Sequence, residues 1–181
     1  MSEIVIEEST DRGMIDLKGD PAEPGFLDAV KAVLGLDLPL VPRTSVSSGD
    51  TTILWLSTDQ WLIVLPYAGS EQVTERLQAA VAPFHALAVD LSDARSIFRI
   101  RGIGAREVVM KGASVDLTHT DCIAGTVRRF NFADLAAMVH VVSDRPETLD
   151  LYVFRSVGNY VRQFLDTAAR PDARLVLWGR Q

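Results

Sequence analysis

VDLSDARSIFRIRGIGAREVVMKGASVDL, residues 89–117, is the stretch from which the fold can be predicted. A polar turn separates its first apolar run from a second strand, expected over Arg95–Arg101. Gly102 and Gly104 then lead into a short helix, expected over Ala105–Lys111. This order of strand, turn, strand, glycine turn and helix either binds a ligand at its glycines or simply joins a strand to a helix.

The composition is that of an ordinary globular protein. The chain has 181 residues, 48% of them apolar, and a formal net charge of −6. This length suits one domain or two small fused units, and the acidic balance argues against nucleic acid as the main partner. The single cysteine, Cys122, excludes an intrachain disulfide and a multi-thiolate metal centre. No secretory signal or membrane-spanning run is recognisable, so we expect a cytoplasmic protein without a membrane partner.

The first half of the chain alternates strands and amphipathic helices. Residues 1–11 are polar and are expected to be flexible. The apolar spacing that follows predicts a strand at 14–17, a helix at 26–34 ending at Gly35, a hairpin of strands 51–56 and 60–65, a helix at 70–81 with Ser70 as N-cap, and a strand at 85–91. The segment between the first helix and the hairpin carries prolines and is expected to be a loop.

The second half repeats this order with one added strand. Its predicted elements are a strand at 95–101, a helix at 105–111, a hairpin of 125–132 and 135–142, a strand at 149–154, a helix capped by Ser156, and a final strand at 175–178. Each half contains the β-α-β-β-α-β order of a ferredoxin-like unit. The sequence therefore predicts an α+β domain made of two such repeats, at about 12–92 and 93–181, with mainly antiparallel sheets.

Gly102 and Gly104 resemble the start of a dinucleotide-binding glycine motif. However, Glu107 occupies the place of the third glycine, and no parallel crossover follows. A carboxylate at this position would also repel a phosphate. We therefore favour a structural turn over a nucleotide site, with Lys111 and Gly112 simply ending the helix.

The remaining reactive side chains do not form a complete catalytic or metal-binding set. His85, His119 and His140 lie in separate segments, and Cys122 alone could join His119 as a nucleophile or ligand. Ser92 lacks the flanking sequence of a nucleophile elbow. Four carboxylates near strand ends are expected to cap turns, although a pair of them could serve in acid–base chemistry: Asp90, Asp93, Asp116 and Asp121. We predict no catalytic, cofactor-binding or metal-binding residues.

The first hairpin is apolar on both of its predicted faces. Trp55 and Trp61 lie on its two arms, with leucines alternating between them. Such a hairpin is covered either by helices above and below or by another protein, because exposed apolar strand faces are costly in a monomer. Trp55 and Trp61 are therefore candidates for a partner interface.

Several stretches resemble the gamma subunit of heterotetrameric sarcosine oxidase. They are GMIDLKGD (13–20), LGLDLP (34–39), ILWLSTDQWLIVLP (53–66), residues 89–117, CIAGTVRR (122–129) and DLYVFRSVGNYVRQFLDTAA (150–169). The family usually has Gly-Pro before Asp-Glu-Trp, whereas this chain has Ser57-Thr58 before Asp59-Gln60-Trp61. Residues 89–117 are also similar to the folate-binding domain of the glycine cleavage T-protein, which implies a duplicated α+β fold.

The resemblance implies a non-catalytic subunit that supports assembly of the complex. The enzyme of this family oxidatively demethylates sarcosine to glycine in sarcosine catabolism, with FAD, FMN and NAD in its alpha and beta subunits and tetrahydrofolate as the one-carbon acceptor. The chain itself is expected to bind none of these cofactors. Its expected partner is the alpha subunit and, through it, the beta and delta subunits of the heterotetramer.

Two other functions stay open on the sequence alone. One is a free-standing folate-binding protein of one-carbon metabolism, of the T-protein type. The other is a hydrolase built on Cys122 and His119.

Overall fold

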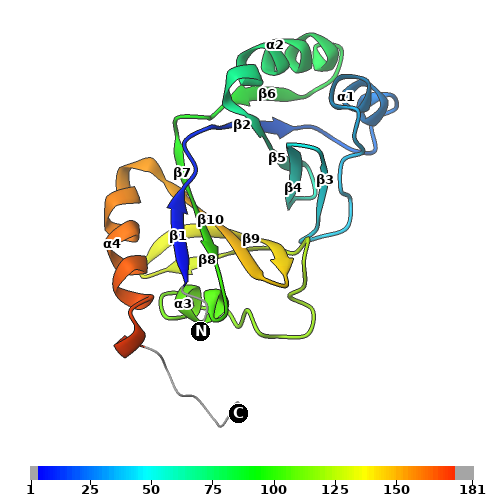
Figure 1. Cartoon of the computed structure of the whole chain (residues 1–181). Helices are drawn as coiled ribbons and strands as arrows, with labels where there is room; N and C mark the ends of the chain where they lie inside the picture. The colour runs from blue at the N-terminus through cyan, green and yellow to red at the C-terminus, as the bar shows by residue number, and fades with distance from the viewer. Residues whose placement is uncertain (1–3, 174–181) are drawn as a thin grey trace. The chain divides into compact units, whose positions relative to one another are not determined.

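The structure is a computed structural model that describes residues 4–173, and Figure 1 shows its helices and strands. Contacts divide the chain into two compact units. Unit 1 contains the residues up to Ser9, Arg95–Ala124 and the residues from Arg128 onward, whereas unit 2 contains Thr10–Ala94 and Gly125–Val127. Each unit is a mainly antiparallel sheet with helices packed on it, which confirms the predicted α+β class.

In unit 2 the strands lie in the order β3-β4-β5-β2-β6. Their bounds, with those of the two helices, are β2 (Arg12–Lys18), α1 (Phe26–Leu34), β3 (Ser45–Ser48), β4 (Thr51–Ser57), β5 (Gln60–Pro66), α2 (Ser70–Val81) and β6 (Leu87–Asp90). Strands β4 and β5 form the predicted hairpin around Thr58 and Asp59. Strand β3 lies in the segment that was expected to be a loop, because its sequence, SVSS, is too short and polar to show a strand pattern.

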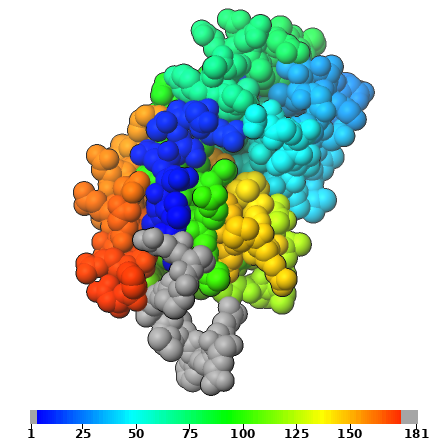
Figure 2. All heavy atoms as spheres, in the orientation of Figure 1, coloured from blue at the N-terminus to red at the C-terminus, as the bar shows by residue number. Residues whose placement is uncertain are grey.

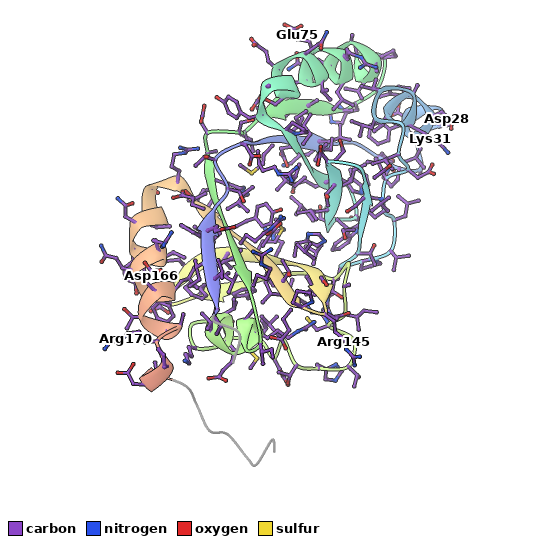
Figure 3. The ribbon with its side chains drawn as sticks, in the orientation of Figure 1. Asp28, Lys31, Glu75, Arg145, Asp166 and Arg170 are labelled. Atoms are coloured by element: carbon purple, nitrogen blue, oxygen red, sulfur yellow. The ribbon has the colours of Figure 1, made fainter. Side chains whose placement is uncertain are left out.

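Both helices of unit 2 pack on one face of its sheet. The core on this face joins strand and helix residues, namely Ile15, Leu17, Ile53, Trp61, Ile63, Phe26, Val30, Leu77 and Val81. The charged side chains of Asp28 and Lys31 on α1 and Glu75 on α2 point away from it (Figure 3). The idea of helices above and below the hairpin is therefore wrong. The opposite face is nevertheless not an exposed apolar surface, because Leu54 and Leu62 are fully buried.

In unit 1 the strands lie in the order β1-β7-β10-β9-β8. The elements are β1 (Val5–Glu8), β7 (Arg95–Arg101), α3 (Ala105–Met110), β8 (Val127–Phe132), β9 (Leu135–Asp144), β10 (Glu147–Phe154) and α4 (Gly158–Ala168). One core joins Phe98, Val139 and Leu151 of the sheet to Val109 of α3 and Leu165 of α4. The second predicted hairpin is present as β8 and β9, and it turns through Ala133 and Asp134.

Strand β1, Val5–Glu8, lies within the segment 1–11 that was expected to be flexible. It pairs antiparallel with β7, from Val5 opposite Arg101 to Glu8 opposite Phe98. Ile6 packs against the core of unit 1, while three of the four residues of β1 are exposed, so its sequence carries little strand signal. The strand expected at 175–178 lies outside the described residues.

The two sheets repeat one order of strands. The order β3-β4-β5-β2-β6 matches β8-β9-β10-β7-β1 position by position. In each sheet the last four of these strands have the arrangement of a ferredoxin-like unit, which confirms the predicted duplication. In unit 2 the strand at this edge of the sheet, β6, comes after the other four in the sequence. In unit 1 the same edge is formed by β1, which comes before the other four.

The second helix of each unit begins after a short 3₁₀ turn. Tyr67–Gly69 precedes α2, and Arg155–Val157 precedes α4. The first backbone N–H of each helix donates to a carbonyl of that turn, so no side-chain cap is used. The prediction that Ser70 and Ser156 are N-caps is therefore wrong: Ser70 is the first residue of α2, and Ser156 lies within the turn.

A close contact recurs where each of these helices crosses the sheet. A Cβ on Gly13, the second residue of β2, would lie 2.4 Å from Cβ of Ser70 at the start of α2. A Cβ on Gly158, the first residue of α4, would lie 2.8 Å from Oγ of Ser96, the second residue of β7. Each unit therefore has one glycine and one serine at the same crossing, with the two residues exchanged between strand and helix.

Replacing Gly13 by serine is expected to lower the free energy of unfolding by about 1–3 kcal/mol, because the added side chain must displace Ser70. The double variant Gly13→Ser/Ser70→Gly recreates the arrangement of unit 1, and we expect it to recover at least half of that loss. Urea unfolding measures both variants. Gly69→Ala is the control, since nothing lies within 4 Å of an added Cβ there. Equal losses in the single and double variants would contradict the close-contact explanation.

Candidate functional site

The glycine turn at the start of α3 is closed by a side chain of the protein itself. Gly102 and Gly104 have φ values of 127° and 92°, in the left-handed region that favours glycine. Oε2 of Glu147 accepts hydrogen bonds from the backbone N–H groups of Gly104, at 3.1 Å, and Arg106, at 3.3 Å. A bound phosphate would need these same N–H groups. The turn is therefore a strand-to-helix connection whose donors are already engaged.

Arg106 holds the loop that follows α3. Its guanidinium donates to the carbonyl oxygens of Leu117 and Cys122 and to the carboxylate of Asp144. Asp144 in turn accepts a hydrogen bond from the backbone N–H of Ala124, at 2.9 Å. The Arg106 side chain is only 11% exposed, so one buried cation organises this loop from the inside.

His119 and Cys122 do not have the properties of a nucleophile and its base. Nδ1 of the exposed His119 lies 2.7 Å from Oδ1 of Asp121, while Cys122 is buried. Burial raises the pKa of the Cys122 thiol, although Arg106 opposes this effect. Reactive cysteines have a lowered pKa instead. Hydrogen bonds from Arg128 and His119 lower the pKa of Asp121. These three side chains therefore stabilise the loop that follows α3.

A polar row crosses the sheet of unit 1. Arg99 on β7 lies opposite Asp150 on β10, and Asp150 lies opposite His140 on β9. The guanidinium of Arg99 binds both carboxylate oxygens of Asp150, at 2.8 and 2.7 Å. His140 is 6% exposed, and burial lowers its pKa to about 4, against the opposing effect of Asp150. Burial therefore keeps the His140 imidazole neutral at pH 7.

The other candidate residues also have structural roles. Oγ of Ser92 accepts a hydrogen bond from the backbone N–H of Met14, at 3.0 Å, in a buried position. Lys111 Nζ donates to the Ala168 carbonyl, at 2.6 Å. Three of the carboxylates accept local hydrogen bonds: Asp90, at the end of β6, from the Ser92 N–H, Asp116 from the Thr118 N–H, and Asp93 from the Tyr67 hydroxyl. No group of three His, Cys, Asp or Glu residues within the described range is placed to hold a metal ion.

A cavity of about 780 Å³ opens in unit 2 and contains the third candidate histidine, His85. Its volume lies within the range of about 300–1,000 Å³ that is typical of ligand pockets. Besides His85, the lining contains the charged side chains of Lys18, Asp20, Glu23 and Asp59 and no other charged residue among those that line it. With three carboxylates and one ammonium group, the lining disfavours an anionic ligand.

The two tryptophans lie opposite each other in the hairpin but differ in exposure. Trp61 is fully buried, and its indole N–H donates to the Pro39 carbonyl at 2.8 Å, whereas Trp55 is half-buried. The Trp61 side chain therefore offers no surface to a partner, because the core of unit 2 encloses it. Trp55 stays a candidate.

Reasoning from the sequence missed the residues that do most of the positioning here. Glu147, Arg106 and Asp150 act on groups 43, 16 and 51 residues away along the chain. One feature of the sequence pointed to the role of Glu147. This residue follows a polar turn and comes just before an apolar strand, at the end of the sheet beside the glycine turn. Its role still depends on the pairing of β10 with β7.

A family model described as the sarcosine oxidase gamma subunit family matches residues 18–170. The chain belongs to this family. The resemblance inferred from the sequence is thereby confirmed. Within the described residues, no helix of this gamma subunit family member is long and apolar enough to cross a membrane. A search of the curated proteins found no match.

Solved structures show that the fold of this gamma-family chain is shared more widely. It is similar to a chain of the heterotetrameric sarcosine oxidase from Corynebacterium sp. U-96 in complex with pyrrole 2-carboxylate, with a TM-score of 0.85, 19% identity, and 97% and 88% of the two chains covered. It is also similar to aminomethyltransferase T of the glycine cleavage system from Bartonella henselae, with a TM-score of 0.64, 14% identity, and 91% and 45% coverage. A third similar structure is the regulatory subunit of aspartate kinase from Thermus thermophilus, with a TM-score of 0.51, 14% identity, and 91% and 97% of the two chains covered.

The free energy of unfolding is expected to decrease as the pH is lowered, because of His140. Its pKa is about 4 in the folded protein, below the ordinary value of 6.5, so the unfolded chain binds the proton first as the pH falls. The contribution of the neutral imidazole to the free energy of unfolding is fully present above about pH 6.5. About 2 kcal/mol of this contribution is lost between pH 7 and pH 5. Urea unfolding at both pH values measures this loss. His140→Gln should reduce it, because glutamine carries no titrating imidazole. An unchanged pH dependence in His140→Gln would contradict the assignment.

Proposed function

We propose that this chain is a non-catalytic subunit of a sarcosine oxidase complex, and that it docks on the alpha subunit and supports assembly. The observation that carries the proposal is the family match over residues 18–170. The likeness in fold to a chain of a heterotetrameric enzyme, over 97% of this chain, supports it. The complex would oxidatively demethylate sarcosine to glycine, in the cytoplasm.

The roles of the reactive side chains support the proposal that this subunit is non-catalytic. The carboxylate of Glu147 fills the glycine turn, and Arg106 ties down a loop. The thiol of Cys122 has a raised pKa, and His119 pairs with Asp121 at the surface. Glu147 and Arg106 thus stabilise the local structure, and Cys122 with His119 does not have the geometry of a nucleophile with its base. This observation also argues against a hydrolase built on Cys122.

We further propose that FAD, FMN, NAD and tetrahydrofolate are held by other subunits. The charges of the cavity in unit 2 support this for folate. Tetrahydrofolate carries a glutamate tail with two carboxylates, and the cavity would bring it near Asp20, Glu23 and Asp59 with only Lys18 as a fixed cation. Carboxylates in the lining repel the carboxylates of a ligand and therefore oppose its binding.

The assembly role can be tested by co-expressing the chain with the alpha, beta and delta subunits of the same organism. We expect it to co-elute with them in size-exclusion chromatography, and we expect the yield of intact complex to fall at least several-fold when it is omitted. A variant of the chain truncated within β10 is the matched control, because it removes a central strand of unit 1. Elution of this chain apart from the other three subunits would refute the proposal.

A free-standing folate-binding protein is the second candidate, and the T-protein fold is the observation that favours it. Calorimetry of the isolated chain with tetrahydrofolate separates the two functions. We expect no binding at micromolar concentrations, because the cavity is acidic. Micromolar binding that is weakened by Lys18→Ala and unaffected by Lys31→Ala would favour the folate-binding function instead.

A further inference from the structure

The segment between α1 and β3 places two large apolar side chains next to each other at the surface. Leu40 is 53% exposed and Val41 is 65% exposed. Among the exposed large hydrophobic residues of the described chain, they are the only two that are consecutive in the sequence. Single exposed apolar residues are normal on a protein surface, whereas adjacent ones can form part of an interaction site. The light-blue to cyan atoms of this segment lie on the face shown in Figure 2.

Hydrogen bonds on both sides of the pair fix the backbone of this segment. The buried indole N–H of Trp61 donates to the Pro39 carbonyl at 2.8 Å. The Thr44 hydroxyl donates to the Val41 carbonyl at 2.7 Å, and the Val127 N–H donates to the Arg43 carbonyl at 2.8 Å. All of these residues belong to unit 2.

Two prolines add to this stiffness. Pro39 and Pro42 have fixed φ angles, and each also restricts the residue before it. Leu38 and Pro39 are buried, so the segment is anchored in unit 2 directly before it becomes exposed. A side chain that is already held in place loses little conformational entropy on binding. The exposed pair is therefore preorganised.

Arg43 gives this surface a charge. It is exposed, and it makes no ion pair with any residue of the described range. Its φ of 67° lies in the left-handed region, where a residue other than glycine costs free energy. Such backbone strain is commonly found at functional positions. A complementary surface would therefore offer an apolar pocket for Leu40 and Val41, with carboxylates at its edge for Arg43.

We infer that Leu40, Val41 and Arg43 form a docking ridge for the alpha subunit of the sarcosine oxidase complex. The ridge inserts its two apolar side chains into an apolar pocket edged by carboxylates. Trp61 acts as a positioning residue, because its indole holds the carbonyl that precedes the ridge. The inference rests on the proposed function and specifies the surface through which that function is performed.

The test measures binding of the purified chain to a complex of the remaining subunits by biolayer interferometry. Leu40→Asp/Val41→Asp is expected to raise the Kd by about 30-fold or more, as for the loss of a central apolar anchor. Arg43→Glu is expected to raise it about five- to tenfold, with the greater part of the effect lost at high salt. Leu87→Asp is the matched control, because Leu87 has the same exposed fraction, 53%, in the same unit. Its Kd should stay within about twofold of wild type.

Circular dichroism and urea unfolding establish that each variant is folded, and Leu40→Ser/Val41→Ser replaces the aspartate pair if the latter does not fold. Wild-type binding combined with unchanged binding of the ridge variants would overturn this inference and leave the proposed function intact. Absence of wild-type binding would refute the proposed function itself. Loss of self-association in the ridge variants, with subunit binding retained, would identify a second copy of this chain as the occupant and also overturn the inference.

Discussion

The contact between a glycine and a serine where the second helix of each unit crosses the sheet limits how close the two layers can lie. In unit 2, Gly13 of β2 lets the first turn of α2 approach the strand, and Ser70 fills the remaining space. The same approach places Ser70 Oγ 3.4 Å from Ser92 Oγ, which also holds the backbone of β2. The absence of a side chain at Gly13 therefore lets β2, α2 and the segment after β6 contact one another.

Unit 1 meets the same limit with the residues exchanged. Ser96 stands on the strand and Gly158 on the helix, again at the second residue of the strand and the first residue of the helix. The constraint therefore acts on the summed volume at the crossing, because either side can carry the glycine. Two repeats that keep this constraint can lose all obvious sequence identity. The order of the elements can therefore show the repeat even where the residues at the crossing are exchanged.

The elements that could be predicted from the sequence are those whose pattern lies within one segment. The hairpin β4–β5 is an example, with dense β-branched and apolar residues and a two-residue turn. Strand β1 could not be predicted, because its four residues become a strand only by pairing with β7, about 90 residues later in the chain. The polar row of Arg99, Asp150 and His140 was missed for the same reason, since strand register alone brings its members together.

Trp61 shows how a residue prominent in the sequence can contribute to binding without touching a partner. The hairpin needs a large apolar side chain at this position, and its indole N–H needs an acceptor because it is buried. The acceptor is the Pro39 carbonyl, which stands directly before the exposed Leu40. A specific protein interface buries about 1,200–2,000 Å² in total, far more than two side chains provide. The ridge is therefore an anchor within a larger contact, and the rigidity that it takes from the core of unit 2 increases what it adds to affinity.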